Sequence, residues 1–117
     1  MPPDLDVIAD PTRRLMLALL AVEPEICVCE FVAALREVQP KVSRHLALLR
    51  DAGWLTSRRE GTWMHYRLRE LPDWARTLVD ALVAGGVPAA ELRGAQARLQ
   101  SYAGRPARTS GAVACQG

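Results

Sequence analysis

The spacing of apolar residues changes once along this chain of 117 residues, and the change limits the folds it can adopt. Up to Gly53, apolar residues recur every three or four positions, as in amphipathic helices. From residue 55 to residue 68 the helical spacing stops, and two short apolar runs flank Glu60-Gly61-Thr62, which is typical of a β-hairpin. The sequence therefore predicts a helical domain that carries one hairpin.

Prolines and glycines divide the helical part of the chain into short segments. Proline favours the first turn of a helix, and glycine favours the residue just after its end. These rules predict helices over about residues 11–22, 28–36 and 39–52, and after the hairpin over 72–84 and 88–102. The apolar stripe of each helix is expected to face a shared core.

Helix, short turn, helix and then a basic hairpin is the order of a winged helix-turn-helix. We expect one mainly α domain over residues 1–102, with the hairpin as its wing and helices near both termini forming a dimer interface. Residues 103–117 are rich in small and polar residues and are expected to form a flexible C-terminal tail. The chain lacks an apolar run of roughly 18 residues and its acidic start does not resemble a signal peptide, so we expect a cytoplasmic protein with no membrane partner.

The charges of the chain are unevenly distributed. Residues 36–69 hold eight basic and three acidic residues, a balance of +5, whereas the whole chain carries only +2. Such a basic block is the electrostatic pattern expected of a surface that binds nucleic-acid phosphates. A solvated surface would give the same pattern, so charge alone leaves both interpretations open.

The outer face of the third helix holds the first group of candidate DNA contacts. Arg44 is our first choice for reading a base, because arginine pairs in bidentate fashion with guanine. His45 lies nearer the apolar flank, where a packed histidine is the alternative. The candidates on this helix are Gln39, Lys41, Ser43, Arg44 and His45.

The hairpin holds the second group of candidate DNA contacts. Arg58 and Arg59 are neighbours on a strand and therefore point to opposite faces, so at least one should face solvent or DNA. His65 and Arg67 share a face of the second strand and are candidates for the minor groove or the backbone. Surface solubility is the alternative role for all of these residues.

Two cysteines, Cys27 and Cys29, stand one residue apart where the second helix begins. In an α-helix, residues i and i+2 lie about 200° apart, whereas in extended backbone they share a face. If both sulfurs hold one ion, this part of the chain must be unwound or must unwind. The two are too close in sequence for a comfortable disulfide, so we expect thiols, which select soft ions. A small buried packing residue is the alternative.

Three segments together resemble the ArsR/SmtB family, and more narrowly its arsenic-responsive repressors. They are CVCEF at residues 27–31, QPKVSRHLALLR at 39–50 and GTWMHYRL at 61–68, and the resemblance covers roughly residues 5–85. It implies a homodimeric winged-helix repressor that binds the double-stranded operator of an arsenic-resistance operon. Such a repressor leaves the operator when trivalent arsenic or antimony binds, and it needs no cofactor to bind DNA.

The resemblance also implies that Cys27 and Cys29 bind As(III) or Sb(III). Similar repressors carry a third cysteine three residues after the second, and Val32 occupies that position here. Water, hydroxide or a small thiol is one candidate for the third position on arsenic. Cys115, from the tail, is another, and the alternative for Cys115 is an uninvolved thiol.

An apolar stripe of Trp74, Leu78 and Leu82 recurs every four residues on the fourth helix. A palindromic operator calls for a twofold dimer. We expect this stripe, with a helix near residues 6–8, to form the dimer interface. The alternative is that the stripe packs on its own domain.

Other functions predict different features. Zinc sensors of this family use histidines on the C-terminal helix, and residues 72–84 have none; cadmium and lead sensors add N-terminal cysteines, and residues 1–26 have none. A Cd/Pb-responsive or a redox-responsive repressor of the same fold remains the alternative. A DNA-binding protein with no effector is another. We do not expect an enzyme, because thioredoxin-like patterns, paired carboxylates and phosphate-binding glycine loops are missing from the sequence.

Overall fold

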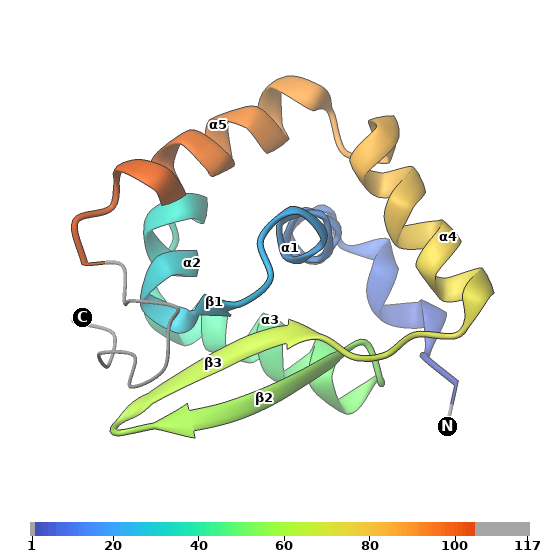
Figure 1. The fold of residues 1–117 in the computed structure, drawn as a ribbon, viewed down its shortest axis with the longest axis horizontal. Coiled ribbons are helices and arrows are strands. Elements are labelled where there is room, and N and C mark those ends of the chain that lie inside the picture. Colours follow the sequence, from blue (N-terminus) through green and yellow to red (C-terminus); the bar gives the residue numbers. More distant parts are fainter. Residues whose placement is uncertain (1, 105–117) are drawn as a thin grey trace.

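The computed structural model describes residues 2–104 and arranges the other helices and a small sheet around α1 (Figure 1). In chain order the elements are the 3₁₀ helix η1 (Leu5–Ala9), α1 (Pro11–Val22), β1 (Ile26–Cys27), α2 (Val28–Leu35), α3 (Gln39–Asp51), β2 (Leu55–Glu60), β3 (Trp63–Leu68), α4 (Asp73–Ala81), the π-helical turn η2 (Leu82–Gly86) and α5 (Ala89–Ser101). The predicted mainly helical fold with a hairpin wing is confirmed. Cys115 and nearly all of the expected tail lie outside the described residues.

The helix ends follow local chemistry. The Asp10 carboxylate accepts hydrogen bonds from the backbone N–H groups of Thr12 and Arg13, at 2.7 and 3.2 Å, and so caps α1. Gly53 follows the end of α3 with a φ of +90°, which side chains rarely adopt. A Cβ atom there would also lie 3.4 Å from the backbone of Pro3, so this turn requires glycine.

The sheet contains one more strand than the sequence predicted. Its order is β1-β3-β2, with both pairs antiparallel, so β3 lies in the middle. The short strand β1 pairs Ile26 with Tyr66 and Cys27 with His65. This pairing fixes Cys27 to the sheet just before α2 begins.

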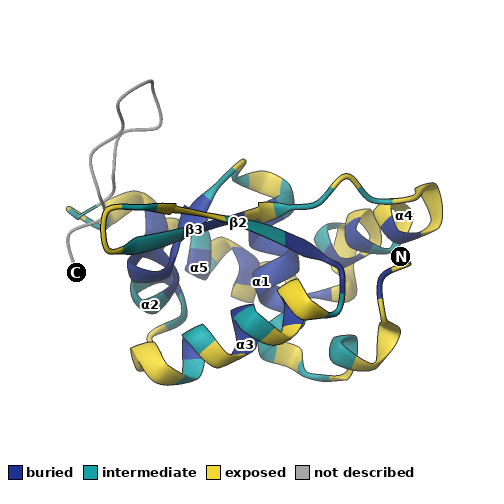
Figure 2. Cartoon of the chain, turned by 90° about the horizontal axis from the view of Figure 1, so that it is seen from below, coloured by how far each residue is buried: buried dark blue, intermediate teal, exposed yellow. Residues whose placement is uncertain are grey.

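The core is centred on α1. Its residues from Leu15 to Leu20 are all buried, and Figure 2 shows how the neighbouring elements turn their buried faces toward it. Helix α5 closes the fold by packing on α2, where the Arg98 side chain donates a 2.8 Å hydrogen bond from Nε to the carbonyl oxygen of Ala34. Each large apolar side chain buried in this way contributes about 1.5–3 kcal/mol. Within residues 2–104, every helix is too short or too polar to span a bilayer.

Candidate functional site

The two cysteines meet at the junction of β1 and α2. Cys27 is the last residue of β1 and the N-cap of α2, with extended backbone at φ −87° and ψ 160°, and Cys29 lies in the first turn of the helix. Their Sγ atoms are 2.6 Å apart, and both residues are buried. The two residues were expected to be too close in sequence for a comfortable disulfide, yet their sulfur atoms lie within this short distance. Because Cys27 is outside the helix, the sulfurs converge without any unwinding of α2.

Glu30 holds this junction in place. Its carboxylate accepts a 2.8 Å hydrogen bond from the backbone N–H of Cys27, which closes a capping box at the start of α2. Glu30 is fully buried, so the bond is shielded from water. Our sequence analysis missed this residue. The signal was present, since Cys27 and Glu30 have the spacing of a capping box in which cysteine replaces serine or threonine.

Two aromatic side chains pack against the cysteines. Trp63 comes from β3 and Tyr102 follows α5, and the two form a small cluster with Cys27 and Cys29, separate from the main core. Beside this cluster is a pocket of about 160 Å³, lined by Cys29, Val32, Ala33, Gln39, Trp63 and Tyr102. Gln39 is the first residue of α3. The pocket therefore connects the cysteine pair with the start of that helix.

The sheet beside Cys27 carries a buried histidine. His65 is only 1% exposed, with Nδ1 3.8 Å from Oε1 of Glu25 and Nε2 3.9 Å from Oε2 of Glu60. The prediction that His65 contacts DNA is therefore contradicted. Alternation along β3 gives it the same face as Arg67, but His65 pairs with Cys27 of β1 and lies between the carboxylates of Glu25 and Glu60. No pattern in the sequence indicates the two-residue strand β1.

The hairpin arginines differ in their surroundings. Arg58, Arg59 and Arg67 are all exposed. Arg58 donates two hydrogen bonds to the Glu25 carboxylate, at 2.6 and 2.8 Å, and these bonds raise the pKa of the Arg58 guanidinium above its ordinary value. Arg58 therefore ties the wing to the segment that precedes β1, while Arg59 and Arg67 extend from the hairpin.

Helix α3 presents a polar side opposite its buried stripe. Val42, Leu46 and Leu49 are fully buried. Gln39 and Arg44 are exposed, Ser43 is half-buried, and Lys41 is half-buried with its Nζ 2.8 Å from Oε2 of Glu37. This side of α3 can therefore meet a partner without any change in the core.

His45 belongs to the inner side of α3. It is 5% exposed, and its Nδ1 lies 3.1 Å from an Arg13 guanidinium nitrogen. Burial lowers the pKa of His45 and outweighs the attraction of Asp10, while the nearby cations Arg13 and Arg44 lower it further. The prediction of a base contact from His45 is contradicted, because the helical turn directs its ring toward α1. The alternative given for His45, a packed histidine, is the one observed.

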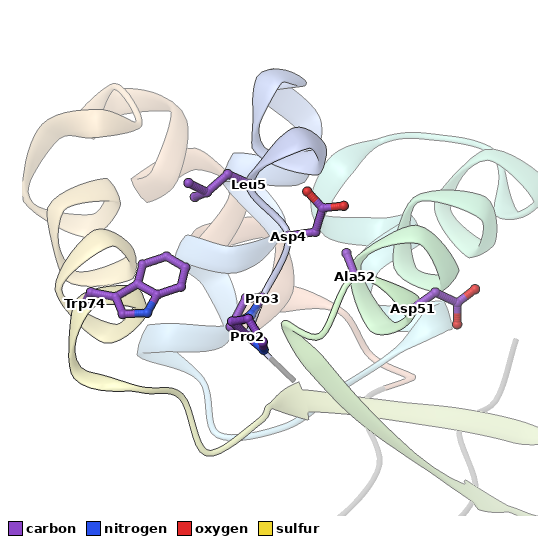
Figure 3. Close-up of a pocket in the computed structure, with 7 residues that line it drawn as sticks. All are labelled: Pro2, Pro3, Asp4, Leu5, Asp51, Ala52 and Trp74. Atoms are coloured by element: carbon purple, nitrogen blue, oxygen red, sulfur yellow. The ribbon is translucent and has the colours of Figure 1, made fainter.

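The expected dimer stripe is only partly exposed. Trp74 is 45% exposed, but Leu78 is half-buried and Leu82 is 7% exposed and packs on its own domain. Leu82 is therefore a core residue, because the turn η2 directs it inward. Our sequence analysis missed Leu5, which is 53% exposed. Figure 3 shows Leu5 and Trp74 pointing toward the same open space, a pocket of about 590 Å³ whose wall includes Pro2 and Pro3.

Comparison with known proteins decides the family. The residue pattern described as "Bacterial regulatory protein, arsR family" matches residues 10–57. The chain is 41% identical over 111 residues to the arsenic resistance transcriptional regulator ArsR2 of Pseudomonas putida, a match covering 93% of this chain and 95% of that protein. This chain belongs to the arsR family.

Two further relatives of this ArsR-family protein match over a shorter region. Identity is 53% over 83 residues with the arsenic resistance transcriptional regulator ArsR1 of Pseudomonas putida, covering 70% of this chain and 62% of that protein. It is 48% over 75 residues with the arsenical resistance operon repressor of Escherichia coli K12, covering 63% of this chain and 64% of that protein. In these two comparisons the match spans less than two thirds of the relative.

Family membership confirms that the ArsR-family protein is a DNA-binding transcriptional regulator and not an enzyme. The matched residues 10–57 include both cysteines and all of α3. Within residues 2–104 of this protein, there is no group of three or more His, Cys, Asp or Glu side chains that could hold a metal ion. The donor set at the junction, within this part of the chain, is therefore two sulfurs.

Proposed function

We propose that this ArsR-family protein is a repressor that binds operator DNA as a homodimer and leaves it when As(III) or Sb(III) binds Cys27 and Cys29. The contact between the two sulfurs, 2.6 Å apart at the β1–α2 junction, carries the proposal. Thiolates are the protein ligands that soft ions prefer, and trivalent arsenic and antimony need few of them. The names of the relatives, which are arsenic-resistance regulators, support the same inducer.

For DNA binding we assign α3 to the major groove and the hairpin to the flanking backbone or minor groove. The exposed side of α3 offers Arg44 for base edges and Gln39, Lys41 and Ser43 for phosphates. Arg59 and Arg67 extend from the wing. Arg58 can bind a DNA phosphate when that phosphate replaces the Glu25 carboxylate as its partner. A dimer places two copies of α3 on half-sites about 34 Å apart.

Release of DNA follows from the position of the sulfurs. Cys29 is part of α2, and α2 packs directly on α3. A ligand that fixes the distance between Cys27 and Cys29 therefore changes the position of α2 relative to the sheet. A small shift of α2 then moves α3. Coupling between such sites is typically about 1–3 kcal/mol.

The first prediction tests the ligands. We expect Cys27→Ser and Cys29→Ser each to bind operator DNA within about threefold of the wild type, because neither side chain lies on the exposed side of α3. Each variant is expected to stay on the operator at arsenite concentrations that release the wild type. The measurement is operator binding by fluorescence anisotropy under reducing conditions, with and without arsenite.

Cys115→Ser is the matched control, because it removes the third cysteine of the sequence and keeps both Cys27 and Cys29. It is expected to respond as the wild type does; loss of the response in this variant would show that the tail supplies a third ligand. Release of Cys27→Ser and Cys29→Ser with wild-type sensitivity contradicts the proposed site.

A redox-responsive repressor is the second candidate, and the same contact between sulfurs favours it, because oxidation would join atoms that already touch. The two candidates differ in their inducer. Release by peroxide, reversed by dithiothreitol and absent with arsenite, would select the redox function.

A further inference from the structure

A large apolar residue lies on the polar side of α3. Leu48 is 42% exposed, whereas Leu46 and Leu49 beside it are fully buried. Leu48 follows Arg44 by four residues, so the two side chains lie on the same side of the helix, one turn apart. The surface that we assign to DNA is therefore apolar at this point.

Pro40 repeats this arrangement toward the start of the helix. It precedes Arg44 by four residues and is exposed, as is Arg44 itself. Proline has no backbone N–H, so this residue cannot donate a hydrogen bond to a phosphate or a base. Pro40, Arg44 and Leu48 therefore form a stripe along α3, which we call the reading stripe, in which one cation lies between two apolar side chains.

The charge of Arg44 limits which partner can cover the reading stripe. A protein or lipid surface that matched the two apolar ends would bury the guanidinium between them, at a large cost in free energy. The major groove of DNA presents both kinds of surface, because guanine accepts hydrogen bonds through N7 and O6 and thymine presents its C5-methyl group. Residues 36–69 also carry a net charge of +5, which favours the surrounding phosphates. DNA bases are therefore the partner that fits this stripe.

We propose that Pro40 and Leu48 read thymine methyl groups on either side of a guanine that Arg44 reads. The inference rests on the proposed placement of α3 in the major groove. One helical turn advances about 5.4 Å, and base pairs follow one another at about 3.4 Å. Each thymine is therefore expected about one or two base pairs from the guanine. Pro40 and Leu48 are then specificity-determining residues, although neither has a side chain that forms hydrogen bonds.

The test removes single methyl groups from the DNA. Selection from randomised duplexes with the reduced full-length protein first gives the half-site. Each thymine of that half-site is then replaced by deoxyuridine, which lacks only the C5-methyl group, and affinity is measured by fluorescence anisotropy. We expect a loss of about fourfold at one thymine on each side of the guanine, as for one buried methyl group, and of less than about twofold at other thymines.

Variants of the protein assign each methyl group to a side chain. Leu48→Ala is expected to abolish the effect of deoxyuridine on one side of the guanine and Pro40→Ala on the other. Leu48→Met keeps an apolar side chain of similar volume and is expected to keep both effects. Val22→Ala shortens an exposed apolar residue at the end of α1, outside the reading stripe, and is the matched control. A loss of stability alone would weaken binding to both forms of the duplex and leave their affinity ratio unchanged.

Arg44→Ala separates this inference from the placement of α3 on which it rests. In a new selection it is expected to relax the preference for guanine. If it does so, but deoxyuridine affects Leu48→Ala and Pro40→Ala as it affects the wild type, or does not affect the wild type, the thymine contacts are overturned and α3 stays in the major groove. If all three variants select the same sequence as the wild type, the placement of α3 is itself overturned.

Discussion

Two histidines show that neighbouring elements decide the role of a side chain. His45 and His65 both occupy segments that otherwise expose basic residues, yet both are buried. His45 contacts Arg13 of α1, and His65 lies between Glu25 and Glu60. Neither contact is visible in the local spacing of residues, because each partner comes from another part of the chain. Both histidines are therefore structural residues behind the surface we assign to DNA.

The lowered pKa of His45 predicts a pH-dependent stability. The unfolded chain binds a proton near the ordinary histidine pKa of about 6.5, while folded His45 resists protonation until a lower pH. Its contribution is therefore fully present above about pH 6.5 and declines as the pH falls toward the lowered pKa. We expect the wild type to lose more thermal stability than His45→Gln between about pH 7.5 and about pH 5.5.

Differential scanning fluorimetry of the two proteins at several pH values checks this prediction. Both proteins keep His65, so the difference between them isolates His45. The lowered pKa of Asp10, which the backbone N–H groups of Arg13 and Thr12 bring about against the effect of burial, acts only near pH 4. If the thermal stability of the two proteins falls equally between about pH 7.5 and about pH 5.5, the role assigned to burial of His45 is contradicted.

At the scale of elements, the start of α2 is the point on which the cysteine site depends. Glu30 fixes the backbone of Cys27, and Cys27 is both a strand residue and the helix cap. We expect Glu30→Ala to lower the free energy of unfolding by about 1–2 kcal/mol, through loss of the cap. We also expect it to make both thiols react faster with a thiol reagent, because the junction loosens.

Urea unfolding and the rate of thiol labelling measure these two effects. Glu30→Gln is the matched control, since its side-chain oxygen can still accept the hydrogen bond from Cys27. If Glu30→Ala unfolds at the same urea concentration as Glu30→Gln, the capping bond does not contribute to stability.

The sequence predicts the longer elements well and the short ones poorly. Helix α1 begins after a capping aspartate followed by proline, and Gly53, with positive φ, follows the end of α3 by two residues, so local chemistry defines both. The strand β1 has only two residues, too few to show alternation. It forms because β3 offers a partner from a distant part of the chain, and contacts of that kind leave no local pattern. The pocket beside Cys29 was missed for the same reason, since its walls come from α2, α3, β3 and the residue that follows α5.

At the scale of the whole molecule, the face around Leu5 and Trp74 is the proposed dimer interface. Leu5 and Trp74 are the large apolar residues that this end of the molecule exposes, and Trp74 is held edge-on against the buried Trp54, with ring centroids 6.2 Å apart. Exposed apolar surface of this kind marks interaction sites. Leu82 is buried in its own domain and is not part of the proposed interface, so the proposed dimer depends on residues from η1 and α4.

We expect Leu5→Arg to give a monomer of 12.8 kDa at micromolar concentration and to weaken operator binding at least tenfold, because a dimer would bury the added charge. Light scattering and anisotropy measure the two effects. Val22→Arg changes another exposed apolar residue, which is 39% exposed at the end of α1, and is expected to leave both properties unchanged. A Leu5→Arg protein that remains dimeric rules out this face.

The convergence of the two sulfurs before any ligand arrives has a kinetic consequence. Their site is assembled by β1 pairing and by the Glu30 cap, so capture of an inducer does not wait for a refolding step. For the proposed sensor, the delay between exposure and gene expression is then set by how fast the toxic compound enters the cell and exchanges its hydroxyl groups. Such a repressor responds to a sudden rise in inducer concentration as fast as these two steps allow.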